Sequence, residues 1–170
     1  RILILYCVVY MIRVNCMALY LLPRALAFEE LTIVMLIWLP SILASFAVLA
    51  LPVSNGILLL SLSFYSVGSF LNTGSEWQRK RWKDANPNSC YRHGLFQYSR
   101  NINYFGDTLL FAGWALATGA WWNVWVPLTM AVSFYWYHVP TKEAYLAQKY
   151  KDEWEDYAAT TPSFIPFVPN

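Results

Sequence analysis

Four long apolar stretches dominate this sequence and limit what the chain can fold into. They run from Ile2 to Leu22, from Leu31 to Leu51, from Gly56 to Leu71 and from Phe105 to Tyr137. Each is near or above the length that an α-helix needs to cross a hydrocarbon core about 30 Å thick. The pattern therefore predicts an all-α, polytopic helical membrane protein.

The last of these stretches is too long for a single crossing. Gly119 and the cluster Trp121-Trp122-Asn123 divide it, and Trp is favoured at the boundary between lipid and water. We therefore predict two short helices that form a hairpin. This gives about five transmembrane helices in one membrane domain that covers residues 1–170.

Composition also favours a membrane location. Of the 170 residues, 58% are hydrophobic and 13% are charged, whereas a soluble domain carries about a quarter charged residues. The net charge of +2 does not indicate a nucleic-acid partner, because the basic residues form one short cluster between apolar stretches. The lipid bilayer is the partner that we expect. The sequence does not indicate an organelle.

Positive charge is concentrated in one segment. Six of the twelve Lys and Arg residues lie in the 72–106 loop, and such residues collect on the side that is not translocated. Two further crossings bring the tail, residues 140–170, to that same side. Within the tail, residues at i, i+3, i+4 spacing predict a helix lying in the membrane interface. These residues are Tyr145, Leu146, Lys149, Tyr150, Glu153 and Tyr157.

A few isolated polar residues need an explanation. Arg13 near the centre of a span costs about 3 kcal/mol or more unless it pairs or reaches the interface. Glu29 or Glu30 is a candidate partner, so Arg13 is either half of a structural ion pair or a cation that faces a ligand. His93 and His138 have no ligating residue at metal-site spacing, so we expect no metal centre.

The ends and the cysteines carry little information. Cys7, Cys16 and Cys90 form no disulfide pattern. Because the chain starts with Arg1 rather than Met, we expect it to be truncated or processed.

The 72–106 loop combines cations, amides and aromatic side chains beside a predicted span. Cations and amides bind phosphates and aromatic faces stack on bases, but the same cations suit anionic lipid headgroups. The sequence contains no Gly-x-Ser-x-Gly, Walker or Gly-x-Gly-x-x-Gly pattern. This disfavours hydrolases and soluble dinucleotide-binding folds.

Three pieces of sequence resemble the steroid 5-alpha-reductase-like family of membrane reductases, in its broad uncharacterised branch. The main piece is Gly94-Leu-Phe-Gln-Tyr-Ser-Arg-Asn-Ile-Asn-Tyr-Phe-Gly-Asp107. A second comprises Asn72, Glu76, Gln78 and Lys83, and a third comprises Val139-Pro-Thr-Lys-Glu143, Tyr157 and Thr161-Pro-Ser-Phe-Ile-Pro166. The likeness covers about residues 65–170.

The resemblance implies a helical membrane fold whose loops close over NADPH. It further implies hydride transfer to the carbon–carbon double bond of a lipid-like enone, with the cofactor carrying the hard chemistry. The cofactor contacts that carry over are Asn72, Glu76, Lys83, Tyr91, Arg92, Asn103, Asp107 and Tyr145. The chain largely lacks the N-terminal part from which the family draws its carbonyl-polarising Tyr and Glu, so the catalytic residues are unknown.

Candidate donors to a substrate carbonyl lie in or just after the first stretch. They are Tyr6, Tyr10, Arg13, Tyr20 and Arg24.

Two departures from the family pattern keep other functions open. Arg-His-Pro-Asn is replaced by Arg100-Asn101-Ile102-Asn103, and Asp107 replaces a Glu. One alternative is a non-catalytic membrane subunit that retains this fold in a larger complex. Another is an S-adenosylmethionine-dependent methyltransferase of isoprenylcysteine or phospholipid, because those enzymes share the Arg-x-x-x-Tyr-x-Gly core.

Overall fold

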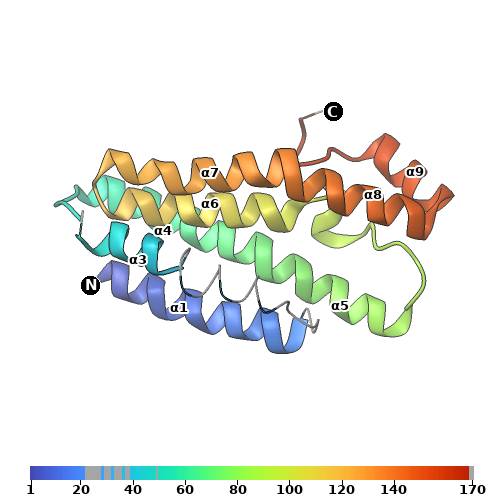
Figure 1. Cartoon of the computed structure of the whole chain (residues 1–170), viewed down its shortest axis with the longest axis horizontal. Coiled ribbons are helices and arrows are strands. Elements are labelled where there is room, and N and C mark those ends of the chain that lie inside the picture. The colour runs from blue at the N-terminus through green and yellow to red at the C-terminus, as the bar shows by residue number, and fades with distance from the viewer. Residues whose placement is uncertain (22–27, 29–31, 33–35, 37–38, 49, 169–170) are drawn as a thin grey trace.

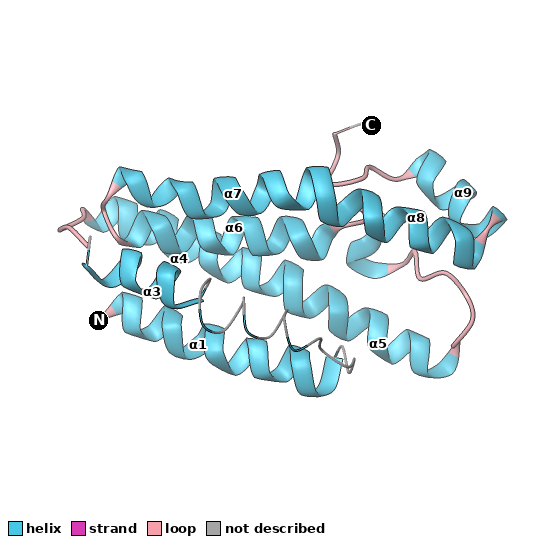
Figure 2. Cartoon of the chain, in the orientation of Figure 1, coloured by secondary structure: helices cyan, strands magenta, loops and turns pink. Residues whose placement is uncertain are grey.

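The computed structural model of the protein describes all residues except 22–27, 29–31, 33–35, 37–38, 49 and 169–170. Every regular element of the described part is a helix, and that part contains no strand. The long helices lie side by side as an elongated bundle (Figure 1, Figure 2). The all-α prediction is therefore confirmed for the described residues.

Helices α1 (Ile2–Cys16) and α3 (Leu39–Val48) lie before the basic segment. Helix α1 continues into η1 (Met17–Leu21), which matches the first predicted stretch. Helix α3 lies within the second predicted stretch, Leu31 to Leu51, of which much of the first half lies outside the described residues.

The next helix is longer than predicted. Helix α4 (Asn55–Ser69), the π-helical η3 (Phe70–Gly74) and α5 (Ser75–Ala85) form one helix of 31 residues. The Ser54 hydroxyl caps its start by accepting the Ile57 amide at 3.3 Å. The first part of the predicted 72–106 loop is thus helical. That prediction was wrong here because residues 72–85 contain no proline and are rich in Glu, Gln, Lys and Arg, which favour helix.

The chain then turns at one end of the bundle and comes back. Residues 86–101 form a loop with the short η4 (Gly94–Gln97), and α6 (Ile102–Ala117) returns along α4. Gly119 lies two residues after the end of α6, and its φ of +68° is a conformation that favours glycine. The break predicted at this position is therefore present. It is followed by η5 (Trp121–Val124) and α7 (Trp125–Ser133).

The tail differs from the single interfacial helix that we expected. Helix α7 continues through η6 (Phe134–His138) into α8 (Val139–Tyr150), so no separate helix begins at Pro140. Lys151 adopts φ 47° and ψ −120°, which ends α8, and α9 (Asp152–Thr160) follows. Leu146 and Tyr150 pack against Cys90, Trp154 and Tyr157. Much of the apolar face of the tail thus covers the loop.

Helices α4 and α6 are in backbone contact. A Cβ at Gly113 would lie 2.5 Å from the Tyr65 amide nitrogen, and one at Gly106 would lie 2.6 Å from the Asn72 amide nitrogen. Small residues allow such close approach between membrane helices. The contact fixes Asn72 of η3 directly beside the start of α6.

Two helices of the described part are long and apolar enough to cross a membrane, Ile2–Leu21 and Asn55–Ala85. Large apolar side chains on their outer faces are exposed, such as Ile12 at 65% and Leu59 at 66%. These helices support association with a membrane. Among the described residues, no other helix meets the same measure; α6, for example, has 16 residues.

Candidate functional site

A buried polar network joins α1, η3, α5 and α6. It comprises Arg13, Asn72, Glu76, Arg79, Asn103 and Asp107. The Arg13 guanidinium donates to Asn72 Oδ1 at 2.6 Å and to the Thr73 hydroxyl at 2.7 Å. It also lies 3.7 Å from the Asp107 carboxylate. The described partners of Arg13 thus come from η3 and α6, while Glu29 and Glu30 lie outside the described residues.

The second half of the network is centred on Glu76, which is 2% exposed. Its carboxylate accepts from Asn103 Nδ2 at 2.8 Å and from Arg79 Nε at 2.7 Å. Asn72 Nδ2 donates to the Asn103 backbone oxygen at 3.2 Å. An ionised carboxylate can accept hydrogen bonds but cannot donate them. The Glu76 carboxylate therefore faces the NH2 group of the Asn103 amide and not its oxygen.

Two polar atoms of this network are buried and have no hydrogen-bond partner among the described residues. They are Arg13 Nη1, a donor, and Asn103 Oδ1, an acceptor. An unpaired buried polar group costs about 1–3 kcal/mol. Such atoms mark positions where a ligand or water completes the site.

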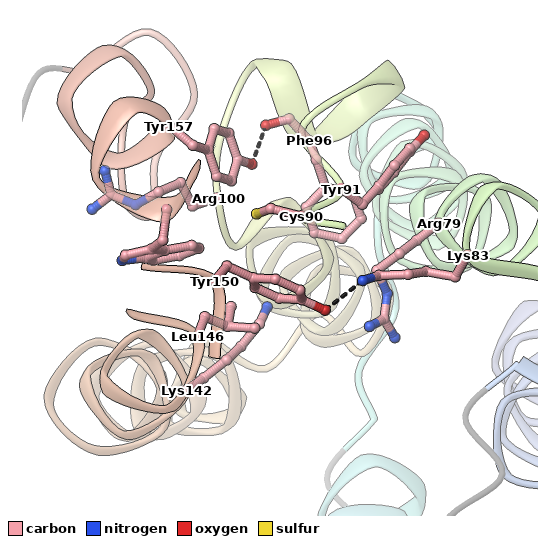
Figure 3. A pocket seen from close by; sticks show the side chains of 11 residues that line it. Arg79, Lys83, Cys90, Tyr91, Phe96, Arg100, Lys142, Leu146, Tyr150 and Tyr157 are labelled. Carbon is pink, nitrogen blue, oxygen red and sulfur yellow. Dashed lines mark hydrogen bonds between the residues drawn. The ribbon is translucent and has the colours of Figure 1, made fainter. Parts of the chain in front are cut away.

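A small cavity lies at the end of the bundle where the loop and the tail meet. Its volume is about 60 Å³, room for about four water molecules. Its walls come from α5, the 86–101 loop, α8 and α9 (Figure 3). We call it the loop-end cavity; it is lined by Arg79, Lys83, Cys90, Tyr91, Phe96, Arg100, Lys142, Leu146, Tyr150, Trp154 and Tyr157.

Of the described residues, four cations and no carboxylate line this cavity. Lys83 Nζ donates to the Ser89 carbonyl and to the Tyr150 hydroxyl. Lys142 Nζ lies 4.9 Å from the centre of the Tyr104 ring. Burial lowers the pKa of Lys142 to about 8, although the nearby Glu76 carboxylate partly opposes this shift. Burial also raises the pKa of the Cys90 thiol, so that thiol stays protonated.

An ion pair holds the tail against the loop. The Arg100 guanidinium donates to both Glu143 carboxylate oxygens, at 3.0 and 3.1 Å, and to the Ala158 and Thr161 carbonyls at 2.6 Å each. Asn101, at the departure from the family pattern, donates to the same carboxylate at 2.8 Å. These bonds fix the segment that leads into Asn103.

Six of the eight residues that the resemblance implies as cofactor contacts lie in one or the other of these two sites. Asn72, Glu76, Asn103 and Asp107 share the polar network. Lys83 and Tyr91 line the loop-end cavity.

The other two predicted residues lie apart. Arg92 is exposed on the loop, outside the lining of the loop-end cavity. Tyr145 is 57% exposed on α8, where its hydroxyl accepts from Lys149 at 3.4 Å.

Most residues that line the loop-end cavity were not predicted as cofactor contacts, among them Arg79, Lys142 and Tyr150. Arg79 follows Glu76 by three positions, which is pairing distance on a helix. Lys142 and Tyr150 are eight positions apart on α8, which places them on one helix face. Both signals were visible in the sequence once a helix had been assigned there.

The candidate donors of the first span are placed differently from one another. The Tyr6 hydroxyl is bonded to Ser61 Oγ at 2.9 Å. The Tyr10 ring packs edge-on against Trp114, with centroids 5.5 Å apart. Tyr20 is 57% exposed, and Arg24 lies outside the described residues. Among the described candidates, Arg13 has a buried donor atom without a partner.

Comparison with known proteins gives one family. A family model described as "Protein of unknown function (DUF1295)" matches residues 10–161. The search of curated proteins gave no match. The matched region includes every residue of the polar network and of the loop-end cavity. Because the match covers most of the chain, the protein belongs to the DUF1295 family.

Proposed function

We propose that the protein is an NADPH-dependent membrane reductase of the steroid 5-alpha-reductase-like type that acts on a lipid-like enone. The DUF1295 family is generally associated with steroid 5-alpha-reductase-like proteins. The observation that carries the proposal is the Asn103 side chain, which is 6% exposed and has an unpaired Oδ1 atom. Amide acceptors of this kind suit the carboxamide of a nicotinamide.

Several residues supply groups that such a cofactor would need. Glu76 holds Asn103 Nδ2, so Asn103 Oδ1 is left as an oriented acceptor for an amide N–H. Lys83 and Arg92 supply positive charge for phosphates. NADPH, when bound, supplies the hydride. In this proposal, Asn72, Tyr91, Asp107 and Tyr145 complete the set of contacts.

The proposal gives Arg13 the role of polarising the substrate. Its Nε and Nη2 atoms are held by Thr73 and Asn72, so the third nitrogen has a fixed direction. A cationic donor placed in this way stabilises negative charge that develops on a carbonyl oxygen.

NADPH binding to the detergent-purified protein tests the cofactor part of the proposal. Asn103→Ala removes the oriented acceptor, so we expect affinity to fall by about tenfold, as one hydrogen bond predicts. Gln97→Ala, at an exposed position of η4, is the matched control and should bind as the wild type does. Equal affinity of both variants and the wild type would count against the proposed role of Asn103.

A second candidate is a non-catalytic membrane subunit, and one observation favours it. The described interior around the first span is filled by aromatic rings: Tyr6 stacks on Tyr65 with centroids 3.9 Å apart, and Trp114 packs edge-on against both. A chain of this kind would bind no NADPH and would purify with partner chains. Affinity purification from the native membrane distinguishes the two functions.

A further inference from the structure

The positive charges around the loop-end cavity are unequally neutralised. Arg79 is paired with Glu76 at 2.7 Å, and Arg100 is paired with Glu143 at 3.0 Å. By contrast, the described residues place no carboxylate within ion-pair distance of Lys142. The same part of the chain gives Lys83 only neutral oxygen partners. Two ammonium groups therefore face the cavity without a paired counter-charge.

The orientation of the side chains supports this reading. In Figure 3 the nitrogen atoms of Lys83 and Lys142 lie near the Tyr150 ring, while the guanidinium of Arg100 points away from them. Both lysines are partly buried. Taking charge out of water is costly unless an opposite charge compensates for it. An anion bound in the cavity that both lysines line would supply that compensation.

The volume of the cavity and the polar groups that line it limit which ligand can bind there. About 60 Å³ holds a tetrahedral oxyanion but no nucleoside. The Tyr150 hydroxyl at the cavity provides a further hydrogen-bonding group beside the ammonium ions. The Glu153 carboxylate accepts a hydrogen bond from the Cys90 backbone amide at 2.7 Å and does not line the cavity.

We propose that the loop-end cavity is a binding site for a phosphate-type oxyanion, with Lys142 and Lys83 as its charged ligands. Lys83 is also a phosphate contact in the proposed function, but the charge argument holds for any phosphate ester and does not require reductase activity. A dinucleotide phosphate, free phosphate and a phospholipid headgroup share the required chemistry. The experiment below separates them.

Sulfate is the probe, because it is a dianion at every pH used and resembles phosphate in shape. Sulfate should raise the thermal unfolding temperature of the detergent-purified full chain more than chloride does at equal ionic strength. Lys142→Gln should weaken sulfate binding by about ten- to a hundredfold, the loss of one charge-assisted bond. Lys149→Gln, an exposed lysine of the same helix, is the control and should keep the sulfate effect.

Proton linkage gives a second readout. The pKa of Lys142 is about 8 without an anion, and a bound anion raises it. Sulfate affinity should therefore fall by up to about tenfold per pH unit above pH 8. Lys142→Arg keeps its charge and should bind sulfate with little pH dependence. The other titratable and charged groups around Lys142 are Glu76, Arg79, Lys83, Cys90, Arg100, Tyr104, Glu143, Tyr150 and Tyr157.

Competition identifies the natural source. Displacement of sulfate by NADPH would assign the site to a dinucleotide phosphate. Displacement by nanodiscs that contain phosphatidic acid, but not by nanodiscs of phosphatidylcholine alone, would assign it to a lipid headgroup. Sulfate binding that depends on Lys142 and resists both assigns it to a free oxyanion. The proposal is overturned if sulfate stabilises the wild type no more than chloride, or if Lys142→Gln binds sulfate as the wild type does. NADPH binding that persists in Lys142→Gln would leave the reductase proposal standing.

Discussion

At the scale of single residues, the polar network explains how charged groups are held between apolar helices. Arg13 would be costly in a span, and three of its contacts reach Asn72, Thr73 and Asp107. Glu76 is balanced by Arg79 and by the Asn103 amide. One donor, Arg13 Nη1, and one acceptor, Asn103 Oδ1, have no hydrogen-bond partner among the described residues. The network is thus largely self-sufficient, with two atoms left for a ligand.

Arg13→Met tests the structural part of this interpretation. The variant leaves Asp107 and Asn72 without their donor, so the free energy of unfolding should fall by about 3 kcal/mol. Adding Asp107→Asn should recover part of that loss, because the two residues are coupled. Thermal unfolding of the single and double variants in detergent measures both effects. An unchanged unfolding temperature in Arg13→Met would mean that Arg13 serves only a ligand.

Part of this site was predictable from residues alone. Asn72 and Glu76 are four positions apart, as are Asn103 and Asp107, so each pair shares a helix face. Their meeting depends on the close contact of α4 and α6, which the spacing of these residues does not predict. Arg92 and Tyr145 match the family motif but point elsewhere. Side-chain direction depends on the packing of the loop and of α8, which local sequence does not encode.

At the scale of elements, the close contact of α4 and α6 positions the site. Gly113→Ala would push a methyl group to within 2.5 Å of the Tyr65 nitrogen and 2.7 Å of the Ser61 oxygen. We expect a loss of about 1–3 kcal/mol in unfolding free energy from this overpacking. Gly56→Ala, where the nearest atom would be 3.9 Å away, should be neutral or stabilising. Comparable losses in both variants, measured by thermal unfolding, would rule out the close contact.

Lys151, at the junction of α8 and α9, allows a test in which the substitution is expected to raise the free energy of unfolding. Lys151 has a backbone conformation that favours glycine, so Lys151→Gly should raise the unfolding free energy by about 1 kcal/mol through relief of strain. Lys149→Gly, two residues earlier and inside α8, should lower it by about 1 kcal/mol. Denaturation curves of the two variants check the pair. Destabilisation by Lys151→Gly would contradict the assigned turn.

Elements were predictable where local signals were strong. Gly119 ended α6 as expected, because a positive φ is accessible to glycine at little cost. The extent of helix after Asn72 was missed, since charged residues suggested a loop although they also favour helix. The break at Lys151 carries no Gly or Pro signal. The local sequence therefore did not predict it; in the structure, α9 packs on Cys90 directly after the break.

At the scale of the whole molecule, the loop and the tail lie at the same end of the bundle (Figure 1). This arrangement agrees with the predicted placement of both on one side of a membrane. Cys90 lies in the loop, but it is 6% exposed and burial raises the pKa of its thiol. We expect it to react slowly with maleimides in the folded protein.

Accessible cysteines are therefore needed to determine the topology. Asn88→Cys in the loop and Glu155→Cys on α9 both replace exposed residues. In a background without Cys7, Cys16 and Cys90, a membrane-impermeant maleimide should label the two new cysteines from the same side of sealed vesicles. Labelling from opposite sides would exclude the proposed arrangement of spans.

Transfer of label from the cofactor tests the proposed reductase most directly. The purified protein would be incubated with NADPH carrying deuterium at the transferable C4 position and with steroid, sterol and linear lipid enones. The account predicts that one enone loses its conjugated double bond and gains one deuterium per NADPH oxidised, with the second hydrogen coming from solvent. Folded protein that oxidises no NADPH and leaves every enone free of deuterium would contradict it.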